Sequence, residues 1–175
     1  MKVLLAAALL LWLSSSPVLA ADECRLELSP ARLDFGSANR VELLSHPAAS
    51  GLGGSFGVRT FHLRIQCVVP GSMTWGFIAP MADAQRYRWT AGTFQIRVMT
   101  ARLDGAPVQL RRTGDDPADA DVLRPADRMI PWRDGVVASG RHLEVELQIE
   151  AGVDDGASRV RDLTRHELHG TLVLD

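Results

Sequence analysis

Gly53-Gly54-Ser55-Phe56-Gly57 matches the G-x-S-x-G pattern of hydrolases, in which a sharp turn from strand to helix exposes a nucleophilic serine. The surroundings of Ser55 do not suit that chemistry. A stretch rich in serine and glycine precedes it, and the residues after it, Val58 to Cys67, alternate as a strand does. We therefore predict no catalytic residue and no enzymatic activity.

Two other groups contain the ligand types of metal ions without the required spacing. His166 and His169 are three residues apart, whereas two imidazoles on one face of a zinc-binding helix are four apart. The acidic run from Asp115 to Asp121 lacks the spacing and the distal glutamate of an EF-hand calcium loop. We interpret both as ordinary solvated residues and predict no metal site and no cofactor.

Three tryptophans are candidates for binding a ligand by stacking. Trp75, Trp89 and Trp132 could together form a platform for a sugar in an exported protein. The alternative is that these large rings fill the core of a β-sandwich, which is the commoner place for them. The sequence leaves both alternatives open.

The N-terminus has the pattern of a secretory signal peptide over residues 1–20. Lys2 precedes an apolar run from Val3 to Leu13, and small residues end the segment at Ala20. This run of about eleven residues is shorter than the roughly 20 that a membrane-spanning helix needs. We therefore predict export through the inner membrane to the periplasm, without membrane insertion. The formal net charge of −2 and the absence of a basic patch argue against a nucleic-acid partner.

Cys24 and Cys67 are the two cysteines of the chain. An even number of cysteines in an exported protein favours a disulfide, and here only one pairing is possible. Closing a loop of about 44 residues corresponds to roughly 4 kcal/mol in the chain-entropy model. Metal and redox pairs use a closer C-x-x-C spacing that is absent here.

The elements that would position these residues are short strands. From Leu143 to Glu150, apolar and polar residues alternate strictly, which predicts a half-buried strand. Asp104-Gly105 predicts a tight hairpin turn between two strands. Strands are expected around Leu26 and Leu28, over 61–67, 74–77, 94–102, 107–111 and 168–174, with surface loops over 46–57 and 113–121. About seven strands without intervening helices predict a single all-β domain, an antiparallel sandwich over residues 21–175.

The segments around the two cysteines share an arrangement with a known group of exported proteins. Cys24-Arg25-Leu26-Glu27-Leu28 is followed by Leu33-Asp34-Phe35-Gly36 and then by an alternating strand that ends at Cys67. A glycine and an alternating strand, Gly170 to Leu174, end the sequence. The chain resembles subunits of chaperone–usher pili, and the run Gly92 to Val98 with its Asp-Gly turn is similar to a fimbrial-type branch of that family.

This resemblance implies a pilin-type, immunoglobulin-like sandwich that lacks its last strand. In the family, a periplasmic chaperone first fills the open groove, and a neighbouring subunit fills it after assembly at the outer-membrane usher. The residues that would line the groove here are Leu26, Leu28, Leu172 and Leu174. The resemblance thus implies a surface-exposed fimbrial protein that contributes to cell adhesion.

The sequence departs from the family pattern at its N-terminus. Only Ala21-Asp22-Glu23 separate the predicted cleavage site from Cys24, and three residues span at most about 10 Å. We therefore expect a subunit that accepts a strand without donating one, at the tip of a fibre or as a minor component. The alternative is a stand-alone periplasmic or secreted β-sandwich module that binds a ligand such as a glycan.

Overall fold

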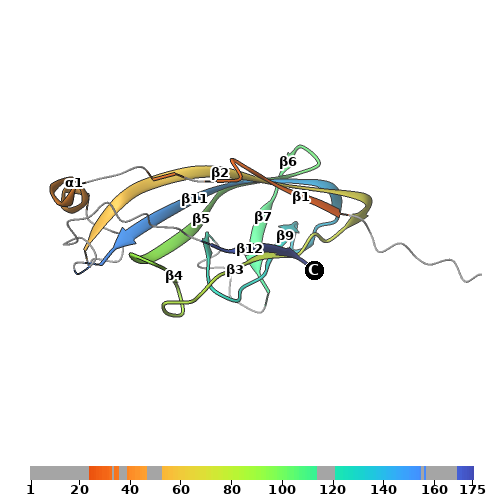
Figure 1. The fold of residues 1–175 in the computed structure, drawn as a ribbon. Helices are drawn as coiled ribbons and strands as arrows, with labels where there is room; N and C mark the ends of the chain where they lie inside the picture. The colour runs from red at the N-terminus through yellow and green to blue at the C-terminus, as the bar shows by residue number, and fades with distance from the viewer. Residues whose placement is uncertain are drawn as a thin grey trace, which may run out of the picture.

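The computed structural model describes residues 24–32, 34–35, 39–46, 53–113, 121–154, 156 and 169–175. In this part of the chain two antiparallel sheets pack as a sandwich, and one disulfide joins Cys24 to Cys67 (Figure 1). The predicted all-β sandwich with one disulfide is confirmed. The predicted signal peptide, residues 1–20, lies outside the described residues. No helix among those that are described is long and apolar enough to cross a membrane.

The larger sheet has the strand order β1-β2-β11-β5-β4, and the short strands β6 and β8 pair with β5. Its long strands form the upper layer in Figure 1. The bounds are β1 Cys24–Ser29, β2 Gly54–Gly71, β4 Tyr87–Trp89, β5 Gly92–Leu103, β6 Ala106–Pro107, β8 Val122–Leu123 and β11 Gly140–Val153.

The smaller sheet has the order β10-β9-β3-β12, with β7 paired to β9, and it lies below part of the larger one (Figure 1). Its strands are β3 Trp75–Ile78, β7 Gln109–Arg112, β9 Met129–Arg133, β10 Val136–Val137 and β12 Thr171–Leu174. β3 and β9 meet at a single register pair, Trp75 with Met129. The predicted terminal strand is present as β12, although Leu168 lies outside the described residues.

Alternation of side chains explains the long central strands. In β11, Leu143, Val145, Leu147 and Ile149 are buried between the sheets, while the residues between them point outward. The same period buries Leu63 and Ile65 of β2. The expected turn after β5 is present, since Asp104 and Gly105 have φ angles of 52° and 80°, and β6 completes a short hairpin there. The strand expected over 107–111 does not continue the hairpin, because β7 pairs with β9 in the smaller sheet.

Residues 39–57 differ from the sequence expectation. The structure has a short helix, α1 Arg40–Ser45, where no helix was expected, and β2 begins at Gly54, so the loop predicted over 46–57 is wrong in its last four residues. Asn39 and Glu42 form a capping box at the start of α1. Gly54 is needed because a Cβ there would lie 2.5 Å from the carbonyl oxygen of Leu43 in α1.

Aromatic rings from both sheets meet in the core. Tyr87 stacks on Phe94 with ring centroids 5.0 Å apart, and Phe77 of the smaller sheet contacts Tyr87 edge-on at 5.3 Å. The Tyr87 hydroxyl donates a hydrogen bond to the carbonyl of Arg124 at 2.9 Å. Burial, with a further contribution from the nearby Asp127 carboxylate, raises the pKa of Tyr87 above its usual value.

Tyr87 should make the folded protein sensitive to alkali. Its phenol ionises near pH 10 in the unfolded chain and at higher pH in the folded one, so its stabilising effect is complete below about pH 10 and is lost as pH rises through the folded pKa. Across that window, unfolding free energy should fall by up to about 1.4 kcal/mol per pH unit. Denaturant unfolding at several pH values measures this slope.

The control is direct because Tyr87 is the chain's one tyrosine. Phenolate absorbance should stay low in the folded protein at pH 10 to 11 and appear near pH 10 in denaturant. Tyr87→Phe should abolish the slope. Phenolate absorbance near pH 10 in the folded protein would contradict the prediction.

The disulfide joins the first strand to the interior of the larger sheet. Cys24 and Cys67 are register partners in the β1–β2 pair, and 43 positions separate them in the sequence. Replacing both by serine should lower the unfolding free energy by about 4 kcal/mol, because the unfolded chain regains the entropy of the open loop.

Urea unfolding with and without reductant measures this effect. Reductant should bring the native chain to the stability of the Cys24→Ser, Cys67→Ser variant and leave that variant unchanged. Equal stability of the oxidised chain and the double variant would show that the bridge adds nothing.

Candidate functional site

Each sheet ends in a strand with one free edge. Among the described strands, β1 pairs only with β2, and β12 pairs only with β3. Both strands lie on the side of the molecule that faces the viewer in Figure 1. One side of the sandwich therefore presents unpaired backbone edges of both sheets.

The four leucines predicted to line a groove lie on these two edge strands. Leu26 and Leu28 of β1 pair in register with Ile65 and Leu63. On β12, Leu172 and Leu174 pair with Phe77 and Trp75. All four leucines pack against the buried core, so the structure brings the predicted residues to one hydrophobic interior.

Burial decreases abruptly at the edge strands. Leu63, Ile65 and Trp75, on the inner strands, have an exposed fraction of 0%. The four leucines beside them are only half-buried, although they face the same core. This difference means that apolar surface remains uncovered along β1 and β12, and we call the region defined by these four leucines the open edge.

The start of β12 is fixed by a close contact. A Cβ on Gly170 would lie 2.0 Å from Cζ of Phe77, so the ring of Phe77 occupies the space that any other residue would need. At the other end, the amide of Asp175 donates to the carbonyl of Thr74 at 2.8 Å. The sequence pattern identified the glycine before the terminal strand but gave no reason for it.

The three candidate tryptophans are not on one surface. Trp75 and Trp89 are 0% and 8% exposed, and the Trp89 indole N–H donates to the carbonyl of Gly152 at 2.9 Å. Trp132 is half-buried, and the guanidinium of Arg111 lies 4.7 Å from the centre of its ring. The structure therefore gives no support to a stacking platform made of all three rings.

Neither Ser55 nor the histidines and aspartates considered above form a catalytic or metal site among the described residues. Ser55 is 3% exposed in β2, its hydroxyl donates to the carbonyl of Ala151 at 3.4 Å, and it accepts from the amide of Gly57. His169 lies two residues before the start of β12, whereas His166 and Asp115 to Asp119 lie outside the described residues. Within the described ranges, no group of three or more His, Cys, Asp or Glu side chains is arranged to hold a metal ion.

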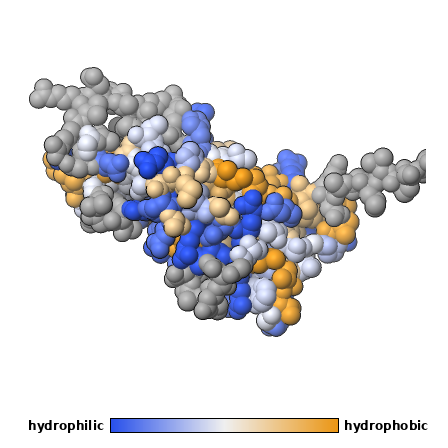
Figure 2. Space-filling view, turned by 90° about the horizontal axis from the view of Figure 1, so that it is seen from below, coloured by the Kyte–Doolittle hydropathy of each residue, from blue (hydrophilic) through white to orange (hydrophobic). Residues whose placement is uncertain are grey.

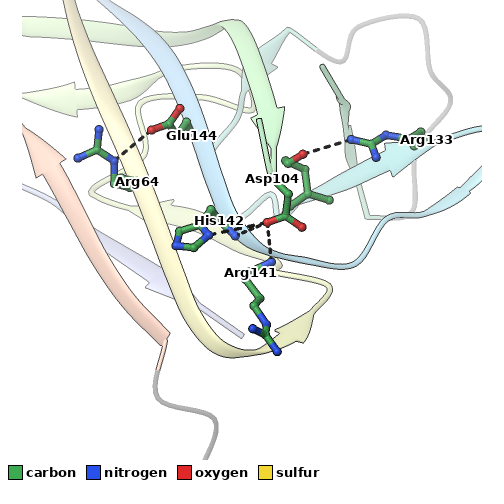
Figure 3. Close-up of polar contacts among 7 residues, drawn as sticks. Arg64, Asp104, Arg133, Arg141, His142 and Glu144 are labelled. Atoms are coloured by element: carbon green, nitrogen blue, oxygen red, sulfur yellow. Dashed lines mark hydrogen bonds and ion pairs between the residues drawn. The ribbon is translucent and has the colours of Figure 1, made fainter. Parts of the chain in front are cut away.

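A shallow polar depression of about 330 Å³ lies on the outer face of the larger sheet (Figure 3). Arg64 and Glu144 form an ion pair at 3.3 Å within it. Hydrogen bonds from the backbone amides of Arg141 and His142, in that order, hold the pKa of Asp104 below its usual value. The charged groups that line the depression pair in part with one another and are open to water, so we assign no ligand to this depression. The lining residues are Arg64, Gln66, Asp104, Gly105, His142 and Glu144.

The surface seen from below shows hydrophobic areas in several separate places between hydrophilic ones (Figure 2). The exposed apolar side chains of the described residues are likewise distributed over α1, β2, β3, β5, β10 and the segment between β3 and β4. Single exposed apolar residues are ordinary on protein surfaces. Val136 and Val137 also lie on an edge strand, β10, but they do not pack against the buried core, whereas the four leucines of the open edge do.

Two free strand edges and the half-buried leucines along them are thus the main candidate site. No protein-family model, curated protein or solved structure matches this chain. Its function is therefore argued from the geometry of the open edge and from the sequence pattern.

Proposed function

We propose that this chain is an exported fimbrial-type subunit that accepts a β-strand from another polypeptide. The donor is a periplasmic pilus chaperone before assembly and a neighbouring subunit afterwards. The observation that carries the proposal is the open edge, where Leu26, Leu28, Leu172 and Leu174 are half-buried on strands with a free edge. The sequence resemblance to chaperone–usher subunits supports the same function.

Strand addition suits this geometry. A strand laid along β12 would pair with its free backbone edge, and every second side chain would point into the sandwich. Those side chains would meet Leu172 and Leu174 from the smaller sheet and Leu26 and Leu28 from the larger one. The partner is therefore an extended segment with alternating apolar residues.

Covering the open edge would be favourable for two reasons. Completing the burial of a half-buried leucine contributes about 1 kcal/mol. An uncovered strand edge is also a site of unwanted pairing between chains. A chain that meets its donor soon after export avoids this hazard, which supports a chaperone as the first partner.

The predicted position as an acceptor-only tip or minor subunit stays a prediction, because residues 21–23 lie outside the described part of the chain. Co-purification of the chain along the whole length of a fibre would contradict that position.

A fused donor strand tests the proposed function. A Gly/Ser linker and a segment of alternating valine and threonine are added after Asp175, and thermal unfolding is compared with the unfused chain. We expect the unfolding midpoint to rise by about 5–10 °C, as a gain of 2 to 3 kcal/mol predicts for a chain of this size. Monomeric, reversible folding with no change on fusion would contradict the proposal and favour a complete, stand-alone binding module.

Matched alanine variants locate the added strand. Leu172→Ala should cost about 1 kcal/mol more in the fused chain than in the unfused one, because only the fused chain buries this side chain fully. Val58→Ala is the control, since Val58 is 48% exposed on β2 and pairs with Glu150 of β11, away from the open edge. Equal costs of Leu172→Ala in both chains would place the strand elsewhere.

A further inference from the structure

Arg128 crosses the smaller sheet to reach the end of β12. It lies just before β9, and its Nε is 2.5 Å from the Oδ2 atom of Asp175, the residue that follows β12. Its Nη1 donates to the backbone carbonyl of Asp127 at 3.3 Å. The guanidinium is thus fixed at one side by its own segment and at the other by Asp175, 47 positions away.

Gly76 of β3 makes this crossing possible. A Cβ at Gly76 would lie 2.6 Å from the carbonyl oxygen of Asp127, 2.9 Å from Nη1 of Arg128 and 3.0 Å from its Cδ. Gly76 is also the register partner of Val173 in β12. The arginine therefore lies over β3 at the position that pairs with the middle of β12, and a side chain there would displace it. A glycine within a strand is a known sign of such a close approach.

Other contacts hold β12 only from one side. The strand has four residues, and β3 is its single partner among the described strands. Short strands at a sheet edge open easily, because few hydrogen bonds must break. An ion pair at the end of such a strand therefore has a larger effect on its order than it would have in the sheet interior.

We propose that Arg128 is a positioning residue for strand acceptance: through Asp175 it holds β12 against β3, so that the free edge of β12 is ordered before a donor strand arrives. The role in strand acceptance rests on the proposed function, whereas the contact between Arg128 and Asp175 does not. Ordering the acceptor beforehand lowers the entropy cost of binding. Arg128 acts through β12 and need not touch the donor.

Amide hydrogen exchange of the unfused chain tests the ion pair between Arg128 and Asp175 without any donor strand. The amides of Thr171 and Val173 face β3, because the amide of Asp175 donates to Thr74 and hydrogen-bonded pairs alternate along an antiparallel ladder. In Arg128→Ala and in Asp175→Asn, these two amides should exchange about two- to fivefold faster, as expected for a partly exposed ion pair. Amides of β11 should keep their rates, which a general loss of stability would not allow. The paired exchange Arg128→Asp with Asp175→Arg should restore slow exchange in β12.

Arg97→Ala is the matched control, because it removes an exposed ion pair with Asp121 at 3.3 Å on the larger sheet. It should leave the β12 amides unchanged. Unchanged exchange of β12 in Arg128→Ala, or equal acceleration in β11, would contradict the claim that the ion pair between Arg128 and Asp175 holds β12.

The fused donor strand separates this inference from the proposed function. If the chain accepts strands, the fused strand should protect the β12 amides and reduce the effect of Arg128→Ala to less than about twofold. A different result would be faster exchange in the unfused Arg128→Ala chain with no protection by the fused strand. It would show that the ion pair between Arg128 and Asp175 holds β12 but has no role in strand acceptance. Full acceleration by Arg128→Ala despite protection by the fused strand would also overturn that role.

Discussion

Strand pairing and apolar burial stop at the same two strands of this sandwich. β1 and β12 each have one partner among the described strands, and their inward leucines are half-buried beside the fully buried Leu63, Ile65 and Trp75. Uncovered apolar side chains are unfavourable in water, and an unpaired strand edge is open to pairing with another chain. A single added strand removes both features, because its backbone pairs with the edge while its alternate side chains cover the core. This coincidence, rather than either feature alone, is the reason to propose the open edge as a site for another polypeptide.

The segment from Arg124 to Arg128 connects this edge with the rest of the core. The carbonyl of Arg124 accepts from Tyr87 in the larger sheet, and Asp127 lies 3.5 Å from Nε of the buried Arg112 in the smaller one. Arg128 then reaches Asp175 beside the free edge. Charges fixed in a core are costly to leave without their partners, so the Arg112–Asp127 pair holds the segment in place. The position of Arg128 is thus determined by contacts on the protected side of the sheet.

The sequence predicts the long strands, because alternation and turn residues are local signals, but it does not predict β4, β8, β9 and β10, which have only two to five residues each. Leu143 to Ile149 could be assigned to a half-buried strand, and Asp104-Gly105 to a turn, without knowledge of any neighbour. The short helix after Asn39 gives only a weak sequence signal, because six residues contain less than two turns of periodicity, although Asn39 and Glu42 have capping-box spacing. The open edge required the family resemblance, since Leu26 and Leu28 alternate as they would in an inner strand. The contact of Arg128 with Asp175 spans 47 positions and depends on how two strands stack, which no local pattern encodes.

The outer face of the larger sheet is less suited to association than the open edge. Glu27, Arg64, Glu144 and Arg102 are successive register partners across β1, β2, β11 and β5, so charges of alternating sign cross the sheet. Another protein that stacked on this face would have to remove water from these charges, and their pairing within the sheet already satisfies part of their attraction. An apolar partner gains little there, whereas at the open edge it covers leucines and pairs with free backbone groups. We therefore expect an extended strand to bind at the open edge in preference to a folded surface binding on the outer face.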